Sequence, residues 1–157
     1  MTENEAQEFY TLTGYQHREQ AQITPAMEDY LEMIYRLSRE EQPGGRVVRR
    51  RDIAEQLHVR PASASKMTAQ LKELGYIEAQ KYGYICLTDK GRDLGRYLLF
   101  RHEVLHRFLC LLNNSENELE QAEKLEHFLT RKTIGNLWHL TQRLEDEKRL
   151  DKTRRHP

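Results

Sequence analysis

Apolar residues recur every three or four positions along most of the chain after residue 24, which predicts a mainly helical protein. In the first such stretch, residues 25–40, Thr24 can cap the helix and Pro25 suits its first turn. The same spacing predicts a long helix over residues 89–112, a shorter one around residues 122–129 and a last one over residues 134–150. Helices therefore make up most of the expected secondary structure.

The stretch "VVRRRDIAEQLHVRPASASKMTAQLKELGYI" contains two short helical patterns separated by a tight turn. Ile53 and Leu57 form the apolar side of the first helix, and Pro61 begins the second. Gly75 ends the second helix as a left-handed cap. Two short helices in this order are typical of a helix-turn-helix.

The next residues, "YIEAQKYGYICLTD", alternate around Tyr82 and Gly83 and predict a two-stranded hairpin. A hairpin directly behind a helix-turn-helix is a wing, and Thr88 then caps the long helix. The expected fold class is mainly α, with a winged helix-turn-helix domain followed by an all-helical domain. We expect an N-terminal arm of unknown role at residues 1–23, the winged domain at 24–93 and the helical domain at 94–157.

Charge is distributed unevenly along the 157 residues, although the formal net charge is zero. Residues 46–66 carry a local net charge of +4, and residues 102–127 one of −4. A nucleic-acid site must therefore come from local clustering rather than from bulk charge. The basic segment coincides with the predicted helix-turn-helix.

The two cysteines, Cys86 and Cys110, form no CxxC pair and are expected to be reduced packing residues. The first residues lack the apolar stretch of a signal peptide, and no run approaches the length of a membrane span. We therefore expect a cytoplasmic protein with no membrane partner.

The second helix of a helix-turn-helix enters the major groove of DNA with its N-terminal residues leading. Small and hydrogen-bonding residues at that end suit close approach. Arginines at the start of the first helix of the motif suit phosphate contact, and the wing tip can reach the flanking backbone. The candidate DNA-binding residues are Arg49, Arg50, Arg51, Arg60, Ser63, Ser65, Lys66, Lys81 and Tyr82. The alternatives are solvated surface residues or a winged helix that contacts protein.

The stretch "AEKLEHFL" places Glu123, Glu126 and His127 on one side of a helix, opposite its apolar residues. Taken alone, this pattern is typical of a solvated face. Asp29 and Glu32, three apart on the first helix, are by themselves ordinary surface acids.

His102 shares a row of the long helix with apolar residues, so on its own it is typical of a boundary histidine. Together, however, four carboxylates and two imidazoles on three helices would repel strongly unless protons or cations neutralised them. Divalent cations accept such oxygen and nitrogen ligands. Spacing alone does not show that the three helices converge.

The segments "PAMEDYLEMIYRL", "RDIAEQLHVRPASASKMTAQLKELGYI", "LTDKG", "FRHEVLHRFL" and "EKLEH" occur in this order between about residues 24 and 150. Together they resemble the diphtheria toxin repressor family, most closely its manganese transport regulator branch. The resemblance implies a metal-dependent transcriptional repressor that binds double-stranded operator DNA as a homodimer and controls metal-ion uptake genes. It makes residues 94–157 a metal-binding and dimerisation domain and implies no catalysis and no small-molecule substrate.

The resemblance also matches the family's metal ligands one by one and implies two neighbouring Mn²⁺ ions per subunit, with Fe²⁺ or another divalent transition metal as alternatives. The matching residues are Asp29, Glu32, His102, Glu123, Glu126 and His127. The iron-responsive relatives have a Met and a Cys where this chain has Asp29 and Glu123. Replacing soft sulfur with hard oxygen suits Mn²⁺. We also expect no third, SH3-like domain of the kind that the iron-responsive relatives have.

Three other functions fit parts of the pattern. An iron-responsive repressor of the same family differs only in its metal, and a winged-helix regulator that senses a small organic ligand would leave the acids solvated. A metalloenzyme is the remaining alternative, because "ExxEH" is one residue away from the HxxEH pattern of zinc peptidases. No HExxH, phosphate loop or nucleophile elbow accompanies it, so we expect no enzyme.

Overall fold

The computed structural model describes residues 23–39 and 47–154. Of the predicted N-terminal arm, only Ile23 lies within this part of the chain. The helices are α2 (Pro25–Arg39), α3 (Arg50–Gln56), α4 (Pro61–Glu73), α5 (Asp89–Asn113), α6 (Leu119–Leu125) and α7 (Arg131–Arg154). The strands are β1 (Val48–Arg49), β2 (Ile77–Ala79) and β3 (Tyr84–Leu87), and two short 3₁₀ turns are η1 (Lys81–Gly83) and η2 (Glu126–Phe128). The mainly helical fold class is confirmed.

The winged helix-turn-helix forms as predicted. Helices α3 and α4 pack together, Pro61 opens α4, and Gly75 follows it with a φ of 78°. The wing, however, belongs to a three-stranded antiparallel sheet in the order β1-β3-β2, whereas the sequence predicted only a hairpin. The missed strand contains Arg49, which we had expected in the first helix of the motif. A strand of two residues is too short to give an alternating pattern.

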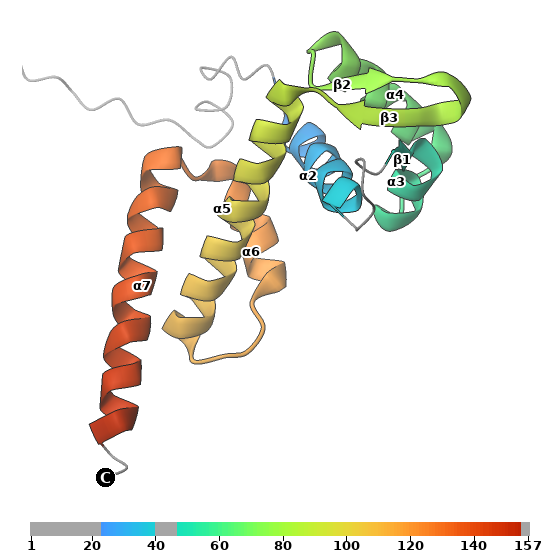
Figure 1. Ribbon diagram of the computed structural model, residues 1–157. Coiled ribbons are helices and arrows are strands. Elements are labelled where there is room, and N and C mark those ends of the chain that lie inside the picture. The colour runs from blue at the N-terminus through green and yellow to red at the C-terminus, as the bar shows by residue number, and fades with distance from the viewer. Residues whose placement is uncertain (1–22, 40–46, 155–157) are drawn as a thin grey trace, which may run out of the picture.

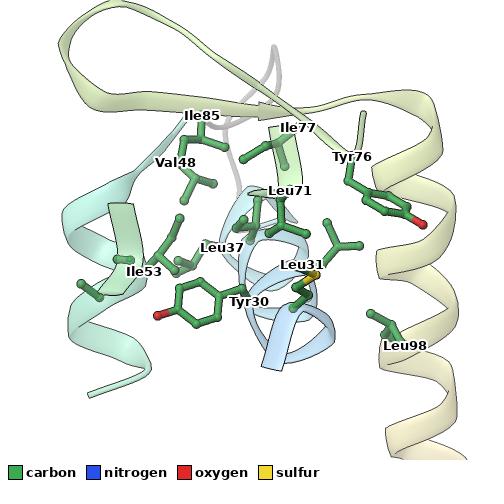
Figure 2. Packing of buried hydrophobic residues seen from close by; sticks show 14 residues of the cluster. Tyr30, Leu31, Leu37, Val48, Ile53, Leu71, Tyr76, Ile77, Ile85 and Leu98 are labelled. Carbon is green, nitrogen blue, oxygen red and sulfur yellow. The ribbon is translucent and has the colours of Figure 1, made fainter. Parts of the chain in front are cut away.

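The core of the winged half lies between α2, α3, α4, the sheet and the start of α5 (Figure 2). Leu31, Ile53, Leu71 and Ile85 are completely buried there. Burial of each such side chain contributes about 1.5–3 kcal/mol, so these contacts fix the winged half as a unit.

Helix α5 joins the two halves of the molecule: it starts beside the wing and runs down between α6 and α7 (Figure 1). The Thr88 hydroxyl caps it by accepting a hydrogen bond from Gly91 N at 3.0 Å. Gly95 lets it approach α2 closely, because a Cβ at this position would lie 2.7 Å from Cβ of Tyr35. The close α2–α5 crossing sets Glu28 of α2 against Arg101 of α5 and brings Glu32 within electrostatic range of His102.

The helical half differs from expectation at "AEKLEHFL". Helix α6 ends at Leu125, and the chain tightens into the 3₁₀ turn η2. Glu126 is fully buried and His127 is half-buried, whereas Glu123 is exposed and Leu125 and Phe128 are 41% and 49% exposed. The alternative of a fully solvated face therefore does not hold at Glu126 and His127. Within the described ranges, no helix is long and apolar enough to cross a membrane.

Candidate metal centre and nucleic-acid interface

Three segments bring the candidate metal ligands together: α2, α5 and the junction of α6 with η2. They form two groups of three donors, and the ligand atoms of each group lie within 4.8 Å of one another. The first group is His102, Glu123 and Glu126, and the second is Asp29, Glu126 and His127. Five of the six predicted residues thus converge, and Glu126 belongs to both groups.

In the first group, Nδ1 of His102 lies 3.1 Å from Oε2 of Glu126 and 3.2 Å from Oε1 of Glu123. The hydrogen bonds to Glu123 and Glu126 raise the pKa of His102 to about 10, against the effect of its burial. The bond from His102 in turn lowers the pKa of Glu123. Without metal, a proton on the imidazole therefore balances the buried negative charge.

In the second group, Nε2 of His127 lies 3.0 Å from Oδ1 of Asp29 and 3.8 Å from Oε1 of Glu126. Interactions with the carboxylates of Asp29 and Glu28 raise the pKa of His127 to about 10, although its burial opposes this. Because Asp29 lies on α2 and His127 on η2, this group spans the two halves of the molecule.

Glu126 provides the test of whether the site suits a metal ion. Its carboxylate is completely buried, and its Oε1 has no hydrogen-bond partner. A buried, unpaired carboxylate oxygen is costly unless a cation compensates it. The imidazole of His102 on one side of this carboxylate, that of His127 on the other, and the neighbouring carboxylate oxygens form donor sets that suit divalent transition metals. The residues present therefore fit such an ion.

Glu32 is the sixth predicted ligand, and the structure places it differently. Its Oε1 accepts hydrogen bonds from Nη2 and Nε of Arg36 at 2.6 and 3.0 Å, one helical turn further along α2. Burial raises the pKa of Glu32, and the charge of Glu126 adds to this, although Arg36 opposes it. Glu32 thus lies in the electrostatic neighbourhood of Glu126 but belongs to neither three-donor group.

Sequence reasoning missed two residues at the site, Glu28 and Arg101. Each directly precedes a candidate ligand in the sequence, but neither has a pattern of its own. Arg101 is buried, with Nη2 at 2.5 Å from Oε2 of Glu28 and at 3.3 Å from Nδ1 of His127. Burial alone would raise the pKa of Glu28, but interactions with His127 and Arg101 hold it below its ordinary value. The signal that identifies Arg101 is the burial of its charged side chain, which only the structure shows.

The predicted DNA-binding residues on α4 lie on the surface. Ser63, Ser65 and Lys66 are exposed along the N-terminal part of this helix, whereas Ala64 is fully buried beneath them. Arg60 is the exposed N-cap residue. This end of α4 therefore presents hydrogen-bond donors to solvent, as a recognition helix requires.

The other basic candidates lie on the strands, α3 and the wing. Tyr82 at the wing tip is 91% exposed beside the exposed Lys81. Arg50 and Arg51 begin α3. Arg49 donates a hydrogen bond from Nη2 to the Tyr84 hydroxyl at 2.8 Å, which orients its side chain along the sheet.

Comparison with known protein families finds a match for each half of the molecule. Residues 22–85 match the model of the N-terminal DNA-binding domain of iron-dependent repressors, and residues 88–153 match the metal-binding and dimerisation domain of the same family. The fold and the site thus define a metal-dependent transcriptional repressor with a winged helix, and not an enzyme. The chain belongs to the iron-dependent repressor family.

The regulator MntR of Geobacillus kaustophilus is 43% identical over 133 residues, which cover 83% of this chain and 92% of the relative. Among solved structures, the metal-dependent regulator MtsR matches with a TM-score of 0.66 and 30% identity, and the manganese regulator SloR with 0.63 and 29%. Each match covers 76% of this chain, which spans only 55% of either solved chain. These relatives confirm the predicted family and its manganese-regulator branch.

Proposed function

We propose that this protein is a cytoplasmic, Mn²⁺-responsive repressor that binds operator DNA as a homodimer and controls genes for metal-ion uptake. The observation that carries the proposal is the buried carboxylate of Glu126, which belongs to both histidine-containing groups and whose Oε1 accepts no hydrogen bond. Relatives described as manganese regulators support the choice of metal.

We propose that the ligands are Asp29, Glu32, His102, Glu123, Glu126 and His127, and that they hold two ions per subunit. Two donor groups that share Glu126 support the number two. Glu32 would have to release Arg36 to join them. Mn²⁺ is the weakest binder of the divalent series, so a site that responds to it relies on hard donors and geometry, which four carboxylates supply.

The coupling to DNA follows from the position of the second group. Asp29 on α2 and His127 on η2 can bind the same metal ion only when the winged half and the helical half keep this relative orientation. A bound cation would supply the positive charge that the imidazole protons provide in its absence. If DNA also binds best to the protein in this orientation, metal binding strengthens DNA binding by the same coupling free energy by which DNA strengthens metal binding. Such coupling is typically about 1–3 kcal/mol.

We further propose that residues 24–93 form the DNA-binding domain and residues 94–157 the metal-binding and dimerisation domain, with α5 crossing between them. In a homodimer, two α4 helices would enter successive major grooves roughly 34–36 Å apart. Contacts to DNA would come from basic and hydroxyl residues of β1, α3, α4 and the wing, all of them exposed except the half-buried Arg50. These are Arg49, Arg50, Arg51, Arg60, Ser63, Ser65, Lys66, Lys81 and Tyr82.

The test is the metal preference of DNA binding in wild type, Glu123→Cys and His127→Ala. Operator binding is measured anaerobically against buffered Mn²⁺, Fe²⁺, Co²⁺ and Zn²⁺. Exchange of one carboxylate for a thiolate should shift activation from Mn²⁺ towards Fe²⁺ or Co²⁺, because soft sulfur favours the later metals. His127→Ala should weaken the response to every metal.

A matched control is Glu120→Cys, since Glu120 is an exposed acid one turn earlier on α6 and faces solvent. It should keep the wild-type order of metals. An unchanged order in Glu123→Cys would remove Glu123 from the ligand set. Operator binding that needs no metal in wild type would contradict the proposed function and favour a regulator of another ligand class.

A further inference from the structure

His127 has two ring nitrogens, and the structure gives them different neighbours. Nε2 faces Asp29 at 3.0 Å, within the second donor group. Nδ1 faces away from that group, with Arg101 Nη2 at 3.3 Å and Glu28 Oε2 at 3.5 Å. The side chain of His127 is only 10% exposed, so protein groups rather than water decide which nitrogen carries hydrogen.

The two neighbours of Nδ1 have opposite consequences for the other nitrogen. A guanidinium has only donors, so Arg101 can bond Nδ1 only when that nitrogen is unprotonated. A neutral ring would then carry its hydrogen on Nε2, and this nitrogen could not bind a metal ion. A carboxylate, by contrast, accepts the hydrogen of Nδ1 and leaves the lone pair of Nε2 free. Among the residues described, Glu28 supplies the only carboxylate beside Nδ1.

The carboxylate of Glu28 is held beside Nδ1 of His127. Its side chain is 14% exposed, and its Oε2 forms an ion pair of 2.5 Å with Arg101, whose side chain is 5% exposed. Neither this contact nor the 3.5 Å contact to Nδ1 of His127 has the geometry of a hydrogen bond in the described residues, so the buried Oε2 keeps its full capacity to accept the Nδ1 hydrogen. The pair also ties α2 to α5, the two helices that carry Asp29 and His102.

We infer that Glu28 is a positioning residue of the metal centre: its carboxylate accepts the Nδ1 hydrogen of His127, which directs Nε2 towards the metal, while Arg101 anchors that carboxylate. The inference rests on the proposed function, because it takes His127 as a ligand. Arg101 has a double role, since it holds Glu28 in place and also competes with it for Nδ1. Such outer partners of a ligating histidine fix the ring orientation and increase the basicity of the ligand.

Two substitutions at one position separate the hydrogen bond from the charge. Glu28→Gln and Glu28→Leu both remove the negative charge, but only Gln keeps an oxygen that can accept the Nδ1 hydrogen. Glu28→Leu should weaken Mn²⁺ binding by about 10-fold to 100-fold, and Glu28→Gln should retain most of the affinity. Binding is measured from the spin-resonance signal of free Mn²⁺ without DNA. Glu103→Gln, which neutralises an exposed acid on α5, is the control for charge alone and should bind as wild type does.

A second measurement does not depend on affinity or on DNA. In nitrogen-labelled protein loaded with a spin-half cadmium isotope, Nε2 of His127 should couple to the metal, and Nδ1 should carry a slowly exchanging hydrogen. Glu28→Leu should lose that protected hydrogen, and Glu28→Gln should keep it. Equal losses of affinity in Gln and Leu, or a protected hydrogen that persists in Leu, would overturn the inference. Absence of any His127 coupling in wild type would instead refute the ligand assignment itself, and the inference with it.

Discussion

The winged half and the helical half of this molecule bury their apolar residues to very different extents. The winged half closes a core from α2, α3, α4, the sheet and part of α5. In the helical half, the corresponding cluster has only three buried members, Leu105, Leu109 and Ala122. Among the described residues, six large apolar side chains of the helical half stay exposed, against two in the winged half. The six are Leu112, Leu119, Leu125, Phe128, Leu144 and Leu150.

This difference shows which part of the fold depends on a partner. Exposed apolar side chains mark an interaction surface where they lie together, and these six belong to the half that contains α6 and α7. The match of residues 88–153 to a dimerisation domain agrees with that interpretation. Trp138 of the same half packs within the chain, edge-on against Phe100. The donor groups lie between the self-contained half and the half that needs its partner.

The largest expected effect comes from truncating the closed core. Leu71→Ala should lower the free energy of unfolding by about 2–5 kcal/mol, because the side chain is completely buried and its loss leaves a cavity. Leu150→Ala removes the same atoms from a position that is 62% exposed in the single chain, so its effect on that free energy should be smaller and should come from contacts with the partner chain. Denaturant unfolding in chelator measures both.

Sedimentation of the same proteins in chelator completes this comparison. We expect a dimer at micromolar concentration in wild type and in Leu71→Ala below its unfolding transition. A wild-type monomer would contradict a partner-covered helical half. Equal destabilisation by the two substitutions would show that the two halves do not differ in how they bury their leucines.

A smaller effect is expected from pH, and it acts at the junction of the halves. The carboxylates around His102 and His127 raise the pKa of each ring from 6.5 to about 10 in the metal-free fold. The stability they contribute is therefore fully present below pH 6.5 and is lost as pH rises through about 10. Mn²⁺ affinity should rise over the same interval, because the metal must displace these protons.

Unfolding measured in chelator from pH 6 to 10 checks the first trend, and Mn²⁺ titration checks the second. His127→Gln should reduce both slopes. His139→Gln, which changes an exposed histidine of α7, should leave them as in wild type. Stability that increases with pH in this interval would mean that the rings are not held as imidazolium by their carboxylates.

The smallest effect is expected on the exposed end of α4. Lys66→Ala should weaken operator binding and reduce the salt dependence by about one counterion, as the loss of one phosphate contact does. Ser65→Ala should weaken binding without changing the salt dependence, because no charge is lost. Mn²⁺ titration should be unchanged in both. Lys148→Ala, on exposed α7, is the control, and equal effects of Lys66 and Lys148 would contradict the assignment of α4 as the recognition helix.

The sequence by itself determined the order of elements and the family. Local signals set the helix boundaries: Pro61 at the first turn of α4, Gly75 behind it, and Thr88 before α5 all act within a few residues of the chain. The same locality explains the error at β1, because a strand of two residues is stabilised by its partner β3 and has no pattern of its own.

Only the tertiary structure decided which charged residues meet. Whether Glu126 faces water or the interior depends on how α6 and η2 pack against α5, and spacing along one helix is the same in both cases. The close approach of α2 to α5 at Gly95 then brings Asp29 to His127 and Glu28 to Arg101. These contacts join residues about 70 to 100 positions apart, and a hydrophobic pattern fixes which face of each helix is buried but not which partner that face will meet.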